Sequence, residues 1–131
     1  MRAVFIPLAI VTMLAACTPS SSPRAESHAD DMSGESIQSL LANGLTLKLG
    51  GPGEGYKGNL RVEADGTAFG SAVLDNGKKL DITGTWTIEN NQFCRQWKFN
   101  NFKKKCETWR KIGENRVEVL IDGKKIGVNS W

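Results

Sequence analysis

The chain has 131 residues and a formal net charge of +3 at neutral pH, which leaves room for one domain and excludes a two-domain enzyme. Its 40% hydrophobic and 24% charged residues also exclude a wholly disordered chain and a protein with several membrane spans. Only one histidine, His28, is present. Because histidine is the usual acid or base at neutral pH and the commonest metal ligand, this composition argues against catalysis.

An export signal is predicted over residues 1–16. Met1-Arg2 provides a short positive start, and the run from Ala3 to Leu14 is apolar except at Pro7 and Thr12. The run is too short to cross about 30 Å of hydrocarbon, and Pro7 is unsuited to the interior of a core helix. The segment is therefore typical of a signal peptide that is removed from the mature protein.

The end of this segment contains a specific motif. The string Leu14-Ala15-Ala16-Cys17 resembles the lipobox of bacterial lipoproteins. The resemblance implies that Cys17 is lipidated, becomes the first mature residue and attaches the protein to the lipid bilayer, where more than one acyl chain gives stable anchoring. Thr18 follows the cysteine where an aspartate would mark inner-membrane retention in enteric bacteria, so we expect the outer membrane of the cell envelope, with the domain facing the periplasm.

A flexible tether is predicted over residues 17–32, followed by a single β domain over 33–131. The tether segment is rich in Ser, Pro and Asp and has almost no large apolar side chain to bury. His28 lies within it. We expect a solvated His28 without a catalytic or ligand role, because such roles need a fixed geometry.

The domain is predicted to begin with one short helix over 34–42. Ser33 is a good N-cap, and Asn43-Gly44 supplies a left-handed stop. Between them an apolar stripe recurs at helical spacing, formed by Ile37, Leu40 and Leu41.

After the helix, apolar residues alternate with polar ones in short runs separated by turn residues such as Asp65-Gly66 and Asp122-Gly123. This pattern predicts about eight strands, at 45–49, 60–64, 67–74, 79–89, 92–98, 105–111, 117–121 and 124–129. Strands joined by tight turns form an antiparallel meander. Closing it into a small lipocalin-like barrel or half-barrel would remove its exposed edges. The Gly-rich stretch 50–55 fits neither a P-loop nor a dinucleotide fingerprint, so we interpret it as a loop.

The cysteines predict a disulfide. Once Cys17 is assigned to lipid, Cys94 and Cys106 remain as an even pair in an oxidising compartment. A hairpin turning near Asn100-Asn101 would set them almost opposite one another. Metal ligation and a reactive thiol are the competing interpretations, but the pair has no histidine nearby and is not a Cys-x-x-Cys motif.

The most distinctive stretch carries a second resemblance. The combination of Gly84-Thr85-Trp86, Cys94-Arg95-Gln96-Trp97, Cys106-Glu107-Thr108-Trp109 and Asp122-Gly123 resembles a small β domain of unknown function in exported alphaproteobacterial proteins, over roughly residues 60–128. It implies no activity. The Gly-x-Trp is also similar to that of lipocalins and of small barrel proteins that inhibit proteases, although lipocalins place this motif on their first strand and here it is central.

Charge is uneven along the domain: residues 30–90 hold five Lys and Arg against nine Asp and Glu, whereas 91–131 hold ten against four. Aromatic and basic residues alternate around the cysteine pair. The candidate binding residues are Trp97, Lys103, Lys104, Lys105 and Trp109. The alternative is that the tryptophans fill the barrel while the three lysines form a solvated hairpin tip.

We expect a non-enzyme with no cofactor, no metal site and no catalytic residues. Export argues against a nucleic-acid partner and favours an anionic envelope component or a target protein. Three functions remain open: a binding module for a small ligand or envelope component, an inhibitor of a protease or lysozyme that uses the basic hairpin, and a structural envelope protein. An open cavity would favour the first, and a filled core with a projecting rigid loop the second.

Overall fold

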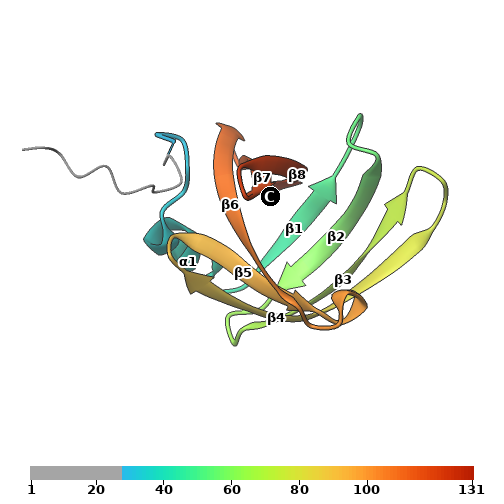
Figure 1. Ribbon diagram of the computed structural model, residues 1–131, viewed down its shortest axis with the longest axis horizontal. Helices are drawn as coiled ribbons and strands as arrows, with labels where there is room; N and C mark the ends of the chain where they lie inside the picture. Colours follow the sequence, from blue (N-terminus) through green and yellow to red (C-terminus); the bar gives the residue numbers. More distant parts are fainter. Residues whose placement is uncertain (1–27) are drawn as a thin grey trace, which may run out of the picture.

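The computed structural model describes residues 28–131 (Figure 1). Eight antiparallel strands over this range form a closed barrel, accompanied by one short α-helix and one 3-10 turn, which confirms the predicted fold class. The proposed signal peptide, Cys17 and most of the proposed tether lie outside the described residues. No helix within residues 28–131 has the length and apolar character needed to cross a bilayer.

The barrel is an up-and-down meander in which each strand pairs with its neighbour in sequence and β8 returns to β1. The β1–β8 seam is short, with Lys48 opposite Ser130 and Leu49 opposite Asn129. The elements, in chain order, are α1 (Gly34–Leu41), β1 (Leu45–Gly50), β2 (Tyr56–Val62), β3 (Thr67–Leu74), β4 (Lys79–Glu89), β5 (Gln92–Trp97), η1 (Lys98–Asn100), β6 (Lys104–Gly113), β7 (Arg116–Ile121) and β8 (Lys124–Ser130).

The helix α1 begins and ends close to its predicted bounds. The Ser33 hydroxyl accepts a hydrogen bond from the Ser36 backbone N–H at 3.1 Å, and Gly44 adopts a φ of 74° after the last turn. Strand β2 starts at Tyr56, four residues earlier than the alternation indicated. The pattern is hidden there because Gly58, an inward position in register with Ala72, has no side chain to reveal it.

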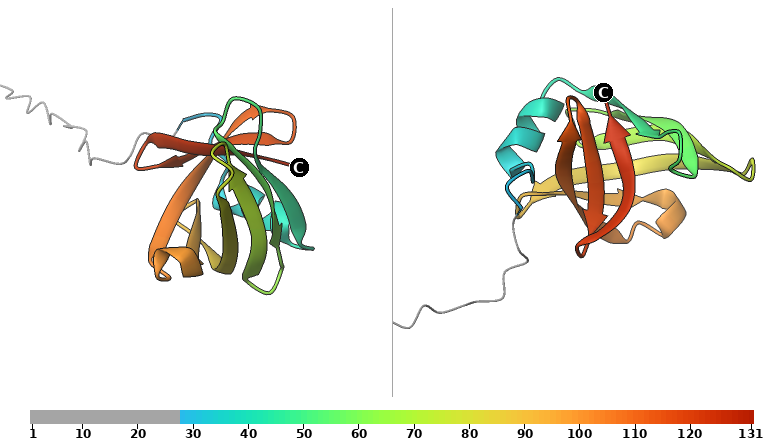
Figure 2. Two further views of the ribbon diagram at one scale, coloured as in Figure 1. Left: turned by 90° about the vertical axis from the view of Figure 1, so that its right-hand side faces the viewer. Right: turned by 90° about the horizontal axis from the view of Figure 1, so that it is seen from above.

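One end of the barrel is covered by α1 (Figures 1 and 2), and aromatic side chains are buried beneath the helix. Ile37 and Leu41 of the helix are fully buried. Beneath them, the Phe93 ring lies between two tryptophans, with its centroid 5.7 Å from that of Trp86 and 4.9 Å from that of Trp109. Because an eight-stranded barrel has an interior just wide enough for side chains, these rings fill this half of it.

Residues 30–32, which we assigned to the tether, belong to the folded domain. The Met32 backbone N–H donates to the Trp109 carbonyl at 2.8 Å, and that of Lys111 donates to the Asp30 carbonyl at 2.9 Å, so the segment pairs with the part of β6 that extends beyond the first residue of β5. Met32 is buried in the core. Asp31 Oδ1 lies 2.7 Å from Arg110 Nε.

The environment of Asp31 favours its charged form. Partial burial alone would raise the pKa of Asp31, but hydrogen bonds from Arg110 and from the His28 backbone N–H outweigh it and hold that pKa below its ordinary value. The folded domain therefore begins near Asp30. Composition concealed this boundary because the segment is polar apart from Met32.

The opposite end of the barrel is its mouth. Because the strands alternate in direction, every second connection lies at the same end, and the mouth is bordered by residues 51–55, 75–78, 98–103 and 122–123. Figure 2 shows η1 and the β3–β4 hairpin at this end, away from α1.

The close approach of β4 and β5 explains why the Gly-x-Trp motif has a glycine at position 84, and it predicts the effect of adding a methyl group there. Gly84 faces inward opposite Trp97, and an added Cβ would overlap the Gln96 carbonyl oxygen. Gly84→Ala should therefore lower the free energy of unfolding by about 2 kcal/mol, as overpacked sites do. Gly113→Ala, at a position with open space around it, should change stability by less than about 0.5 kcal/mol. Equal midpoints for the two variants in urea would contradict the packing explanation.

Candidate functional site

A cavity of about 140 Å³ lies inside the barrel near the mouth. Its walls are mainly apolar, and four polar side chains converge on it from β2, β5, β6 and β8. The lining residues are Leu47, Leu49, Tyr56, Leu60, Ile82, Phe93, Arg95, Trp97, Glu107, Val119, Ile126, Gly127 and Asn129. A concave, apolar space with a few convergent polar groups is the usual form of a small-molecule site.

An ion pair forms the floor of this cavity. Arg95 Nε lies 2.6 Å from Glu107 Oε2, and only 12% of the Arg95 side chain and 8% of the Glu107 side chain are exposed. The second carboxylate oxygen of Glu107 accepts a hydrogen bond from the Trp109 indole at 3.1 Å. Glu107 thus holds Arg95 from one side and joins the cavity to the aromatic core on the other.

The guanidinium of Arg95 retains donors for a ligand. Its contact with Glu107 uses Nε, and its two amino groups form no hydrogen bond with any of residues 28–131. The Arg95 Cζ atom lies 5.7 Å from the centre of the Trp97 ring. Lys105 is directly opposite Arg95 in the register of β5 and β6, so it faces inward as well and adds positive charge at the mouth.

Tyr56 and Asn129 supply neutral polar groups on the opposite wall. The Tyr56 hydroxyl accepts a hydrogen bond from the Val128 backbone N–H at 3.2 Å, which leaves its own hydrogen for another acceptor. Burial, together with the negative charges of Glu54 and Glu107, raises the pKa of Tyr56, so the hydroxyl stays a neutral donor. A side chain at Gly127 would overlap this hydroxyl. The Asn129 amide forms no side-chain hydrogen bond within residues 28–131, and it lines the cavity.

No protein-family model, curated protein or solved structure matches this chain. Arg95 offers two amino groups to an acceptor, Tyr56 offers one hydroxyl donor, and Asn129 offers both a donor and an acceptor. The apolar walls accommodate a hydrocarbon or aromatic group. This arrangement suits recognition of a small molecule with an apolar body and an acceptor-rich end.

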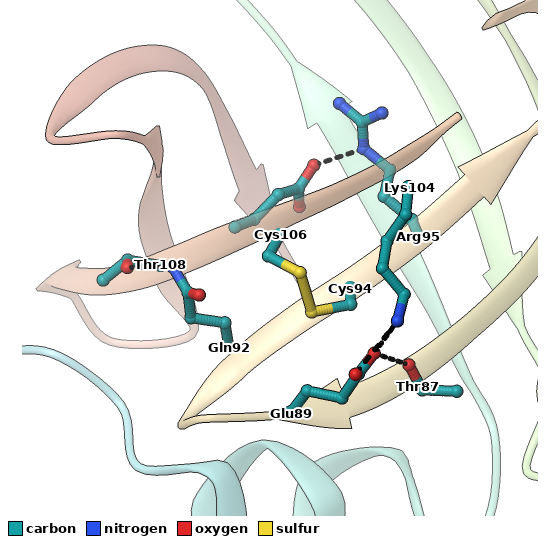
Figure 3. Close-up of a disulfide and its surroundings, with 9 residues drawn as sticks. Thr87, Glu89, Gln92, Cys94, Arg95, Lys104, Cys106 and Thr108 are labelled. Atoms are coloured by element: carbon teal, nitrogen blue, oxygen red, sulfur yellow. Dashed lines mark hydrogen bonds and ion pairs between the residues drawn. A yellow bond between two sulfur atoms is a disulfide. The ribbon is translucent and has the colours of Figure 1, made fainter. Parts of the chain in front are cut away.

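The predicted disulfide is present on the outer face of the barrel (Figure 3). Cys94 and Cys106 lie directly opposite each other in the β5–β6 pair. Glu89 is close to both sulfur atoms, but a bonded sulfur is no longer a thiolate ligand. Glu89 instead pairs with Lys104, whose Nζ lies 2.7 Å from its carboxylate, and hydrogen bonds from Lys104 and Thr87 lower the pKa of Glu89.

The five candidate binding residues occupy different environments. Trp97 lines the cavity, whereas Trp109 is fully buried and packs in the core. The three consecutive lysines separate as well: Lys103 is exposed at the hairpin tip, Lys104 reaches along the outer wall to Glu89, and Lys105 faces the mouth. Only Trp97 and Lys105 therefore lie at the cavity end of the barrel interior.

Sequence reasoning missed all four polar residues of the cavity, which are Tyr56, Arg95, Glu107 and Asn129. Arg95 and Glu107 occupy inward positions of strands β5 and β6, where alternation alone leads one to expect apolar side chains. A usable signal was present, because inward-facing Phe93 and Trp97 set the phase that also points Arg95 inward. A charged residue on the apolar face of a strand needs a buried partner, and Glu107 is the carboxylate within reach.

The disulfide predicts a redox-dependent stability. Replacing both cysteines, Cys94→Ala with Cys106→Ala, should lower the free energy of unfolding by about 3 kcal/mol, since the bond closes a short loop in the unfolded chain. A reductant should lower the thermal midpoint of the parent protein and leave that of the double variant unchanged. Alkylation of either cysteine in unreduced, folded protein would contradict the pairing.

Proposed function

We propose that this protein is a membrane-anchored envelope lipoprotein whose barrel is a non-catalytic binding module for a small ligand. The observation that carries the proposal is the cavity at the mouth, which Arg95 lines and where its two amino groups form no hydrogen bond with residues 28–131. The lipobox at Cys17 supports the anchor. Within residues 28–131 both cysteines are bonded to each other and the lone histidine is exposed outside the cavity, which favours binding over catalysis.

The size of the cavity limits the part of the ligand that enters it. A cavity of about 150 Å³ with apolar walls holds a benzene-sized molecule, so about 140 Å³ accommodates an aromatic ring or a short branched chain. The polar end of the ligand would lie toward Arg95, Tyr56 and Lys105. We therefore infer a small amphipathic molecule with a carboxylate or another acceptor-rich group.

A second candidate, inhibition of a protease or lysozyme by the basic hairpin, is favoured by one observation. The connection between β5 and β6 projects from the mouth and is held by the disulfide and by internal hydrogen bonds. A rigid projecting loop suits insertion into an enzyme cleft. The open cavity favours the first candidate, because a plug needs no interior site.

Benzoate tests the ligand class, because it joins a benzene-sized ring to a carboxylate. It should bind the parent protein about tenfold more tightly than benzyl alcohol does, since charge-assisted hydrogen bonds to Arg95 contribute more than neutral ones. Dissociation constants come from amide shifts in two-dimensional NMR, and the shifted signals should include Gly127, Asn129 and the Trp97 indole.

Matched variants locate the effect. Arg95→Gln should remove the preference for benzoate, and Tyr56→Phe, which leaves the buried ion pair intact, should weaken benzoate binding by a smaller factor. Arg61→Gln is the control, because Arg61 pairs with Glu63 and does not line the cavity. This variant should change the dissociation constant of neither benzoate nor benzyl alcohol. Benzoate shifts that are equally large in the parent and in both cavity variants would exclude this site.

The anchor is tested separately at Cys17. Cys17→Ser should move the exported protein from the membrane fraction to the soluble fraction in high salt, because the acyl chains are proposed to be the only stable attachment. Its thermal midpoint should equal that of the parent domain. Sedimentation of the variant with membranes in high salt would contradict the lipid anchor.

A further inference from the structure

The tip of the β5–β6 hairpin, residues 98–103, exposes two aromatic side chains. Phe99 is 48% exposed and Phe102 is 54% exposed, although neither helps to fill the core. Both belong to the short 3-10 turn and its exit, at the mouth of the barrel (Figure 1). Exposed large apolar side chains that gather at one place mark interaction sites more often than singly scattered ones do.

The backbone conformation at Phe102 is one that phenylalanine rarely adopts, so stability of the fold does not account for this residue. Phe102 has a φ of 56° and the preceding Asn101 a φ of 52°, in the left-handed region that favours glycine and asparagine. An aromatic residue in this conformation is unfavourable, and the partial burial of Phe102, which is 54% exposed, gives little stabilisation in return. A conformational outlier of this kind points to a role outside the folded core.

The tip is held rigidly. Backbone N–H groups of Asn101, Phe102 and Lys103 donate to the carbonyls of Lys98, Trp97 and Asn100, at 3.1, 2.9 and 3.0 Å. The Gln96 side-chain amide donates to the Phe102 carbonyl at 3.0 Å. The disulfide joins the two strands immediately below. Binding through this tip would therefore immobilise little additional chain.

Along the chain, the charged residues next to the two phenylalanines are all basic. Lys98 and Lys103 flank them and are exposed, and neither forms a salt bridge with residues 28–131. The sequence contains no acidic residue between Glu89 and Glu107. Lysine can keep its ammonium in water while its stem lies along an apolar surface.

We propose that residues 98–103 dock reversibly on a bilayer containing anionic phospholipid, with Phe99 and Phe102 entering the interface and Lys98 and Lys103 contacting the headgroups. Rings on a convex, lysine-flanked tip match a fluid surface with an apolar layer beneath negative charge. An acidic protein cleft would satisfy the lysines but would also have to supply apolar pockets for two exposed rings. The proposal does not depend on the ligand of the cavity.

Chain length allows this docking together with the proposed anchor. Asp31 pairs with Arg110, about six residues along β6 from Lys104, which corresponds to roughly 20 Å of strand. Residues 28–31 form a hydrogen-bonded turn, so the segment that can extend runs from Cys17 to His28, about 11 residues that span up to about 38 Å. Both attachments can therefore reach the same bilayer.

A fluorophore at the tip tests insertion locally. In the full chain carrying Cys17→Ser, Phe102→Trp should give an additional emission that shifts to shorter wavelength with vesicles of phosphatidylglycerol and phosphatidylcholine, and should remain unshifted with phosphatidylcholine alone. Phe69→Trp is the matched control, because Phe69 is 54% exposed on the outer wall, and its emission should remain unshifted with both. The amino-terminal segment is identical in both proteins, so it cannot produce a difference between them.

Affinity for the same vesicles tests the contributions of charge and ring. Lys98→Gln with Lys103→Gln should weaken binding about fivefold for each lysine, whereas Lys48→Gln with Lys111→Gln, an equal charge change elsewhere, should have little effect. Phe99→Gln with Phe102→Asn should also weaken binding by about tenfold or more, and the asparagine suits the left-handed backbone. Binding that survives the changes at the tip, or shifts that Phe69→Trp reproduces, would overturn the proposal.

Discussion

Both oxygens of the buried Glu107 carboxylate are hydrogen-bonded, one by Arg95 and the other by the Trp109 indole. A buried charge without partners would be unfavourable by several kcal/mol, so the positions of these two side chains are linked. Trp109 packs against Phe93 in the aromatic half of the barrel, while Arg95 lines the cavity in the other half. The Glu107 carboxylate thus lies between the packed aromatic part of the interior and the part that contains the cavity.

Most of the fold follows from local sequence patterns. Ser33 and Gly44 delimit the helix, and pairs such as Asn90-Asn91 and Asp122-Gly123, which adopt positive φ, fix the hairpins whose alternating strands predict a meander. Closure follows from the need to remove exposed edges. The short segment 30–32 escaped prediction because its attachment depends on Arg110, a residue about 80 positions away.

The candidate site was less predictable than the fold. Alternation assigns charged residues to the solvent face, but Arg95 faces inward. Its positive charge is balanced there by Glu107 on the neighbouring strand. The three lysines at 103–105 look equivalent in the sequence, yet strand register gives each a different neighbour. The disulfide was predictable because both partners lie in one hairpin, where the turn and the register determine their distance. Cavities depend on the fit of side chains from many strands, and no local pattern encodes this fit.

The meander topology also determines the order in which the chain can fold. Seven of the strand pairings over residues 28–131 join neighbours in sequence, and each closes a short loop at small entropic cost. The β1–β8 seam joins residues about 80 positions apart through two opposed pairs. Loop-closure entropy is therefore largest for this contact, and we expect barrel closure to follow formation of the local hairpins, including the disulfide hairpin. Before closure, the free edges of β1 and β8 are the surfaces through which the chain would aggregate.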